Sequence, residues 1–152
     1  MAVHQHRVQV FWGHCDPAGI VYFPRFFDMF HEAMETWFAA CLGAPYDDVI
    51  VRRKIGFPSV HTEADFKKPT AFGETVVVEL RLEHLGRSSM RLAYRIVGEG
   101  GESDVRGTGA TVCAVMDLDP DSERFRRSMP LPDDLREAMQ AFAGLHGSSV
   151  TP

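Results

Sequence analysis

Residues 16–41 read DPAGIVYFPRFFDMFHEAMETWFAAC, a loop containing proline and glycine that runs directly into a strongly apolar segment. Apolar side chains recur in this segment at the i, i+3, i+4, i+7 spacing of one helix face; they are Phe26, Met29, Phe30, Ala33, Met34, Trp37, Phe38 and Cys41. Pro24 suits the first turn of a helix, and Gly43 and Pro45 are typical of the residues beyond its end. We therefore expect a helix over 24–41, with an apolar face broad enough to need a sheet as its cover.

The apolar period changes beyond Pro58 from that of a helix to two, which is typical of β-strands. The predicted strands cover 7–12 (with Val8, Val10 and Trp12 on one face), 60–66, 75–83, 89–96 and 105–117, and short helices are predicted at 46–54 and 132–143. The last three strands are joined by loops too short for crossover helices, so they form an antiparallel meander. The fold class is therefore α+β, in a single domain over 1–152 with a flexible tail at 144–152.

Composition narrows the functions that the chain can have. Its 152 residues carry a formal net charge of −5, which argues against binding to nucleic acid or to an anionic membrane. We find no signal peptide, and no stretch approaches the roughly 20 apolar residues of a membrane span. The three cysteines, Cys15, Cys41 and Cys113, lie far apart without metal-ligand spacing, so we expect a cytoplasmic protein without a metal site.

Asp16 is the candidate catalytic residue. An aspartate in water has a pKa of about 3.9, so as an ionised group it acts as a nucleophile or as a general base. The loop leads into the start of the predicted helix, where unpaired backbone N–H groups can bind a developing oxyanion. The alternative is that Asp16 only starts a turn ahead of Pro17. Cys15 is not expected to be the nucleophile, because an unperturbed thiol is mostly protonated at neutral pH.

The run from Asp16 to Pro24, followed by an aromatic helix, resembles the signature of the 4-hydroxybenzoyl-CoA thioesterase family of hotdog-fold proteins. Further pieces resemble the family in order and spacing: Pro58-x-Val60, Ala64-x-Phe66 with Pro69, LGRSSM at 85–90 and MPLP at 129–132. The resemblance covers residues 5–137. It implies the hotdog fold, an antiparallel sheet wrapped around one long apolar helix. It also implies a homo-oligomer (a dimer, often a tetramer) that hydrolyses an acyl-CoA thioester near a subunit interface, with CoA as part of the substrate and no cofactor.

The resemblance also implies roles for single residues. Asp16 supplies the reactive oxygen, the backbone N–H of Phe23 binds the oxyanion, and Gly19 allows close approach of the backbone to the ligand. The turn formed by Arg87, Ser88 and Ser89 holds the CoA phosphates, and Tyr22, His31, Val60 and His61 are candidates for binding the substrate.

The identity of the acyl group stays open because of His31. Family members that act on a ring hydroxyl can present an acid in this part of the helix, whereas this chain has a histidine there. His31 is alternatively a surface residue that interacts with Asp28 and Glu35. An aromatic acyl group of the benzoyl type is favoured by the many Phe and Met residues, although core packing explains these equally well.

Two other functions fit a hotdog protein. A hydratase or dehydratase would need a histidine opposite Asp16, and His61 and His84 are the candidates on the predicted strands. A subunit without catalytic activity would bind an acyl-CoA or an acyl-carrier protein and leave it unchanged.

Overall fold

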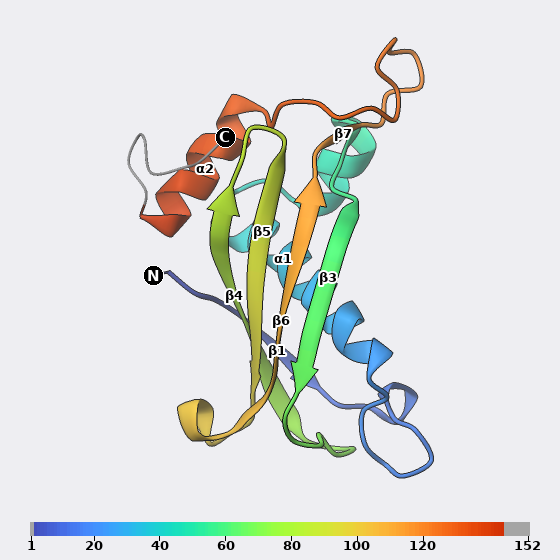
Figure 1. Ribbon diagram of the computed structural model, residues 1–152, viewed down its shortest axis with the longest axis vertical. Helices are drawn as coiled ribbons and strands as arrows, with labels where there is room; N and C mark the ends of the chain where they lie inside the picture. The colour runs from blue at the N-terminus through green and yellow to red at the C-terminus, as the bar shows by residue number, and fades with distance from the viewer. Residues whose placement is uncertain (1, 145–152) are drawn as a thin grey trace.

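The computed structural model describes residues 2–144 (Figure 1). In it, helix α1 (Pro24–Cys41) has the bounds that the sequence predicts. Its first residue is Pro24, and beyond its end Gly43 has a φ of +62°, a left-handed conformation that glycine adopts without strain. The buried side chains of α1 are those of the predicted apolar face: Phe26, Met29, Phe30, Ala33, Met34, Trp37 and Phe38.

Five antiparallel strands form the main sheet, in the order β1-β4-β5-β6-β3. They are β1 (His4–Gln9), β3 (Ser59–Phe66), β4 (Thr75–Leu85), β5 (Ser89–Val97) and β6 (Val105–Ala114). The predicted meander is confirmed by the pairing of β4 with β5 and of β5 with β6. Figure 1 shows the sheet lying across α1. The predicted α+β hotdog architecture is thereby confirmed.

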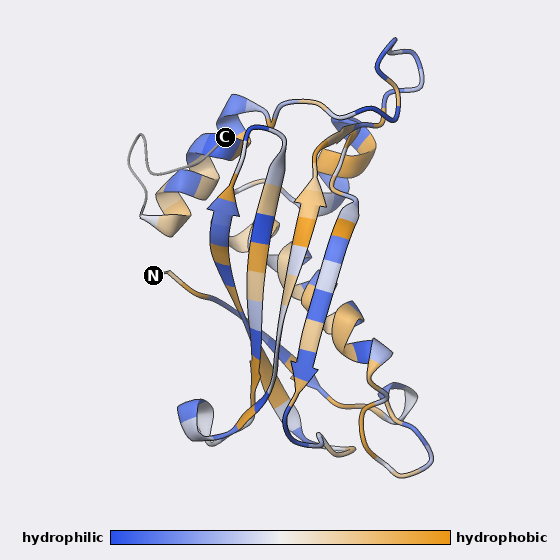
Figure 2. Ribbon diagram, in the orientation of Figure 1, coloured by the Kyte–Doolittle hydropathy of each residue, from blue (hydrophilic) through white to orange (hydrophobic). Residues whose placement is uncertain are grey.

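The core lies between α1 and the inner face of the sheet. Figure 2 shows hydrophobic and hydrophilic residues alternating along the strands, as expected when one face is buried. The ring of Phe30 on α1 stacks on that of Tyr94 on β5, with centroids 4.5 Å apart and planes inclined by 9°. Gly109 on β6 pairs with Tyr94, and a Cβ atom at Gly109 would lie 2.5 Å from Cε2 of Phe30. The missing side chain therefore lets the helix approach the sheet.

The structure corrects the predicted end of the first strand. Trp12 lies in a 3-10 turn (Trp12–His14) and not in β1. The N–H of Phe11 donates to Nδ1 of His14 (2.9 Å), and the N–H of His14 donates to the carbonyl of Phe11 (3.0 Å). These local bonds turn the chain before the period-two pattern ends.

The last predicted strand is interrupted at Val115. Its remainder, β7 (Met116–Asp117), pairs with β2 (Ile55–Gly56) in a separate two-stranded sheet. The N–H of Val115 still bonds to the carbonyl of Ser88, directly before β5 (2.9 Å), and the next residue, Met116, pairs with Gly56 of β2 instead.

The other helices are shorter than α1. The helix predicted at 46–54 is a π-helical turn (Asp48–Arg52), and the C-terminal helix is α2 (Asp133–Ala143). None of the helices within residues 2–144 is long and apolar enough to cross a membrane. The single domain over 1–152 stays a prediction, and the predicted tail, apart from Gly144, lies outside the described residues.

Candidate active site

The Asp16 loop (residues 14–22) is a small hairpin that ends at the start of α1. Its two arms are joined where the N–H of Tyr22 donates to the carbonyl of His14 (2.9 Å) and where the N–H of Asp16 donates to that of Ile20 (2.9 Å). At the tip, the N–H of Gly19 donates to the carbonyl of Asp16 (2.9 Å), and Gly19 has a φ of +77°. Glycine is required at this position for a tight turn without strain.

The carboxylate of Asp16 has one oxygen engaged and one available. Its Oδ1 accepts the N–H of Ala18 (2.9 Å), which is the turn interaction that aspartate commonly makes before proline. Among the described residues, Oδ2 has no hydrogen-bond partner, and the side chain is partly exposed. Asp16 can therefore close the turn with one carboxylate oxygen and react with the other.

Phe23 follows this loop as the residue that caps the N-terminus of α1. Its carbonyl accepts the N–H of Phe26 (3.1 Å), but its own N–H has no partner within residues 2–144. A free N–H at the positive end of a helix dipole suits a negatively charged oxygen. Asp16, Gly19 and Tyr22 thus lie on one loop, and Phe23 directly follows it at the start of α1.

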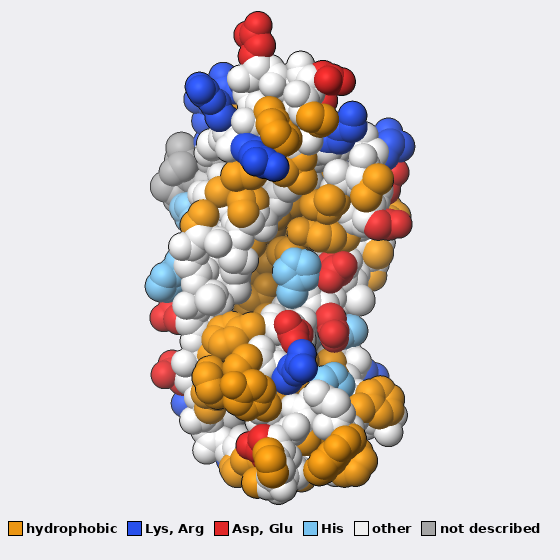
Figure 3. Space-filling view, turned by 90° about the vertical axis from the view of Figure 1, so that its right-hand side faces the viewer, with side chains coloured by type: hydrophobic (Ala, Val, Ile, Leu, Met, Phe, Trp, Pro, Cys, Tyr) orange, Lys and Arg blue, Asp and Glu red, His pale blue; other side chains and the backbone are white. Residues whose placement is uncertain are grey.

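Exposed aromatic side chains surround the Asp16 loop. This aromatic patch consists of Phe11, Trp12, Tyr22, Phe23, Phe66 and Phe72, each between 45% and 59% exposed. Figure 3 shows apolar side chains gathered toward the end of the molecule that carries the loop. Exposed apolar areas of this kind mark binding surfaces for a ligand or another chain.

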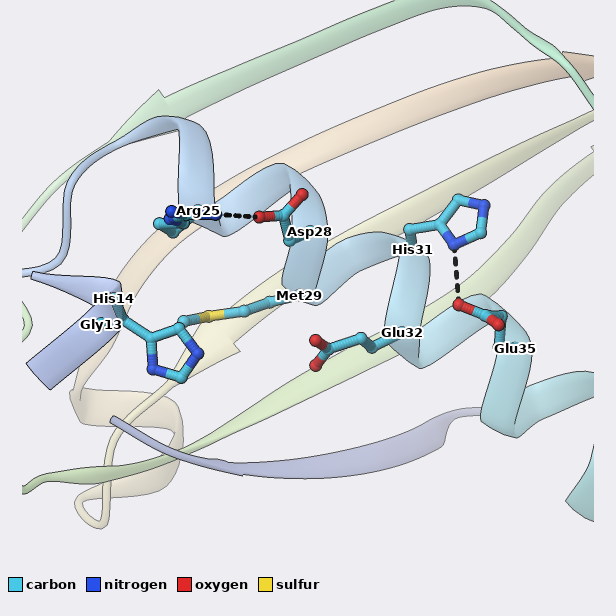
Figure 4. Close-up of a pocket in the computed structure, with 8 residues that line it drawn as sticks. All are labelled: Gly13, His14, Arg25, Asp28, Met29, His31, Glu32 and Glu35. Carbon is cyan, nitrogen blue, oxygen red and sulfur yellow. Dashed lines mark hydrogen bonds and ion pairs between the residues drawn. The ribbon is translucent and has the colours of Figure 1, made fainter. Parts of the chain in front are cut away.

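His31 lies two turns farther along α1, on its exposed face. Its Nδ1 atom is 2.9 Å from Oε2 of Glu35, which leaves Nε2 available (Figure 4). The two residues border a hollow of about 550 Å³ that His14 and Glu32 also line, the histidine from the loop and the glutamate from the helix. His31 thus makes the surface contact with Glu35 and keeps one ring nitrogen for a ligand.

A second, smaller hollow of about 110 Å³ reaches inward from His31, between α1 and β3. Its walls combine aromatic rings with hydroxyl groups: Phe27, Phe30, Met34, Ser59, Thr62, Tyr94 and Thr111. Burial raises the pKa of Tyr94 well above its usual range, so its phenol is neutral and can donate a hydrogen bond. The hollow is therefore apolar with a polar side, a combination that suits a substituted ring.

Val60 and His61 lie on the exposed edge strand β3. Side chains alternate along a strand, and Thr62 bonds to Thr111 on the inner face (3.4 Å), so its neighbour His61 points to the outer face. There it lies 3.7 Å from Glu63. Val60 falls at the irregularity in the pairing with β6. Within one chain, Ser59 and Thr62 therefore line the inner hollow together with His31, and the two predicted residues do not.

The turn formed by Arg87, Ser88 and Ser89 lies at the opposite end of the sheet from Asp16 (Figure 1). Its backbone is held by α2, because Nη2 of Arg136 donates to the carbonyls of Gly86 (2.8 Å) and Arg87 (3.0 Å). The 11 residues of β4 separate this turn from the Asp16 loop, a distance of about 33 Å at roughly 3.3 Å per residue. One chain therefore does not bring the two predicted sets together.

Other candidate chemistry is not supported by the positions of the residues. His84 lies near the end of β4 that leads to Arg87, and His61 faces outward, so neither is opposite Asp16 in the chain. The thiol of Cys15 donates to the carbonyl of Phe11 (3.6 Å). Within residues 2–144, no three His, Cys, Asp or Glu side chains could together hold a metal ion.

Comparison with known proteins shows the family to which the chain belongs. The family model of the thioesterase-like superfamily matches residues 10–139. The chain belongs to this superfamily.

Relatives of this thioesterase-like protein include a 1,4-dihydroxy-2-naphthoyl-CoA hydrolase of Synechococcus elongatus, 30% identical over 146 residues that cover 94% of this chain and 99% of the relative. A 4-hydroxybenzoyl-CoA thioesterase of Pseudomonas is 31% identical over 86 residues, 56% of this chain and 60% of that protein. The crystal structure of a 1,4-dihydroxy-2-naphthoyl-CoA thioesterase from Synechocystis matches with a TM-score of 0.78 and 25% identity, covering 90% of this chain and 95% of the other. The expected family and fold are thereby confirmed.

Three features of this thioesterase-like protein were missed in the sequence. The hydroxyl groups of Ser59, Thr62 and Thr111 come together beside His31 through the pairing of β3 with β6. The alternation of side chains along one strand does not show which residues of another strand lie next to it. The support of the turn by Arg136 joins positions about 50 residues apart. Arg106, within the predicted strand over 105–117, is buried, and its burial depends on contacts with residues distant in the sequence.

Proposed function

We propose that this protein hydrolyses the thioester of an acyl-CoA to a free acid and CoA. The observation that carries the proposal is the Asp16 loop, which joins a carboxylate with an available oxygen to a free N–H at the start of α1. The relatives of the chain, named as hydrolases of CoA thioesters, support the same reaction.

Asp16 acts on the thioester by one of two routes. As a nucleophile, its oxygen bonds to the carbonyl carbon, the C–S bond breaks, and CoA leaves as a thiolate that takes a proton; water then cleaves the mixed anhydride. As a general base, Asp16 takes a proton from a water molecule whose oxygen bonds to the same carbon; the C–S bond then breaks, and the CoA thiolate that leaves takes the proton from Asp16. In both routes the N–H of Phe23 donates to the developing oxyanion, a contribution of about 3 kcal/mol to transition-state stabilisation.

The acyl group that we favour is a single aromatic ring. The inner hollow of about 110 Å³ is of the same order as the cavity of roughly 150 Å³ that is known to take up benzene, which favours one ring over two. Nε2 of His31 and the hydroxyls of Thr62 and Thr111 are positioned for hydrogen bonds to a polar substituent on that ring.

We further propose that two chains complete each site. β3 is an edge strand with exposed residues on both faces, so a second copy can pair with it about a two-fold axis. The aromatic patch would be covered in the same assembly. Arg87, Ser88 and Ser89 of the second chain then hold the CoA phosphates, with charge-assisted hydrogen bonds from the arginine. A tetramer, a cytoplasmic location and a reaction without metal or cofactor belong to the same proposal.

The test is a panel of benzoyl-, 4-hydroxybenzoyl-, 1,4-dihydroxy-2-naphthoyl- and fatty-acyl-CoA esters, followed by release of free thiol. We expect the single-ring esters to react fastest. Asp16→Asn should lower kcat by about 10²- to 10⁴-fold with little change in CoA binding, because it removes the base or nucleophile and preserves the shape of the side chain. Asp47→Asn is the matched control, since Asp47 is exposed and makes no side-chain hydrogen bond within residues 2–144.

Three outcomes would contradict the proposal. Full activity of Asp16→Asn would exclude the role of this carboxylate. Hydration of an enoyl-CoA without thiol release would show a hydratase. Tight binding of every ester without turnover would show a binding subunit.

A further inference from the structure

Segment 67–74, which connects β3 to β4, is joined to the Asp16 loop by backbone hydrogen bonds. The N–H of Val21 donates to the carbonyl of Thr70 (2.8 Å), and the N–H of Phe72 donates to that of Gly19 (2.9 Å). The ring of Phe72 also contacts that of Trp12, with centroids 5.4 Å apart. The position of the Asp16 loop therefore depends on the position of this segment.

Arg106, at the start of β6, anchors this segment at both ends. Its backbone carbonyl accepts the N–H groups of Lys67 (2.9 Å) and Lys68 (3.2 Å). Its guanidinium donates to the carbonyl of Pro69 (3.2 Å) and to both carboxylate oxygens of Glu74 (2.7 and 2.9 Å). Glu74 in turn accepts the N–H of Ala71 (2.7 Å).

The remaining donors of the guanidinium are also used. Nε and Nη2 of Arg106 donate to the two oxygens of Asp104 (2.8 and 3.0 Å), and Nη1 lies 3.4 Å from the hydroxyl of Thr70. Arg106 is only 8% exposed. The planar fork of arginine serves two carboxylates and a carbonyl at once, which the single ammonium group of lysine cannot do.

We propose that Arg106 is the residue that positions the Asp16 loop for catalysis. It contacts neither Asp16 nor the substrate, and it acts through segment 67–74 and the two hydrogen bonds that join this segment to the loop. This inference rests on the hydrolysis proposed above. Loss of the Arg106 contacts should lower kcat more than it raises KM, because the loop carries the reactive oxygen, whereas the CoA phosphates bind elsewhere.

The test compares Arg106→Lys with Arg95→Lys. Arg95 is the matched control: it also joins two carboxylates, those of Glu79 on β4 (2.7 Å) and of Glu102 in the turn after β5 (2.9 Å), but within the described residues it makes no hydrogen bond to segment 67–74. With benzoyl-CoA, Arg106→Lys should lower kcat by about 10- to 100-fold at nearly constant KM, since small displacements of a reacting group are costly. Arg95→Lys should keep the wild-type kcat.

Hydrogen exchange measures the same effect without activity. The amides of Val21 and Phe72 should exchange faster in Arg106→Lys than in the wild type, and at the wild-type rate in Arg95→Lys. Glu74→Gln, which retains an oxygen for Ala71 and removes the charge, should show the same faster exchange and serves if Arg106→Lys does not fold. Unchanged exchange in both variants, or a wild-type kcat in Arg106→Lys, would overturn the proposal. If the wild type hydrolyses no ester, the proposed function fails and exchange alone decides the role of Arg106.

Discussion

Asp16 uses one carboxylate oxygen to close its own turn, and this bond restricts how the other oxygen can point. A reacting group that is held in one rotamer loses less entropy on reaching the transition state than a mobile one. The hydrogen bond to Ala18 therefore contributes to catalysis by orientation, even though it is a common turn interaction.

The ion pair of Glu74 with Arg106 makes the stability of the fold depend on pH. The hydrogen bonds from Arg106 hold the pKa of this carboxyl group below its usual range. A lowered pKa in the folded state stabilises the fold fully above the unfolded value of about 4.3, and the contribution is lost as the pH falls through the lowered value. Glu74→Gln should therefore lower Tm near neutral pH, and its difference from the wild type should shrink as the pH falls below about 4.3, the pKa of the group in the unfolded chain. Thermal unfolding followed by circular dichroism measures both; a difference that stays constant with pH would contradict this account.

The elements differ in how far their own residues determine them. Helix α1 begins and ends as predicted because its signals are local: Pro24 at the start, the apolar spacing, and Gly43 beyond the end. The turn from Asp16 to Gly19 is equally local, because its bonds join residues within the turn. Strand β3, by contrast, lies beside β6 through pairs such as Ala64 with Gly109, far apart in the sequence.

Contacts between distant residues also explain what the sequence did not predict. The predicted last strand ends early because its partner changes from β5 to β2 after Val115, and the bond of Arg106 to Glu74 joins β6 to segment 67–74. In the sequence each of these residues is an ordinary member of a strand or turn. Only the register of the sheet brings them together.

Gly109 tests the packing of α1 on the sheet. Gly109→Ala places a Cβ atom against the ring of Phe30, which already stacks on Tyr94, and the helix must shift. We expect the free energy of unfolding to fall by about 1–3 kcal/mol, as in other overpacked cores. Urea denaturation measures the change, with Thr108→Ala on the outer face as control. Equal stability of the two variants would show that the helix is free to move away.

At the scale of the whole molecule, the two predicted parts of the site lie at opposite ends of one chain. Asp16 lies beside the start of β4, and Arg87 follows its end. A substrate that contacts both parts in the proposed assembly would take Asp16 from one chain and Arg87 from the other. Each chain would then contribute to two sites.

Mixing two inactive variants tests this arrangement. Asp16→Asn removes the reactive oxygen and Arg87→Ala removes a phosphate ligand, so each alone should be nearly inactive at low substrate concentration. If chains are unfolded together and refolded in equal amounts, random pairing restores about one quarter of the sites, because half of the dimers hold one intact site of two. Steady-state thiol release measures the recovery. No recovery from a mixture that contains mixed dimers would show that each site is built within one chain.

The two tryptophans of the chain lie in opposite surroundings. Trp37 has no exposed surface and packs against Phe38 and Phe142, whereas Trp12 is 59% exposed beside the loop of the candidate site. The fluorescence of an indole ring depends on its contact with water. The emission of Trp37 therefore reports on unfolding of the core, and the emission of Trp12 reports on the binding of a ligand or a second chain over the aromatic patch. The protein thus carries two internal optical reporters, one for folding and one for events around Asp16.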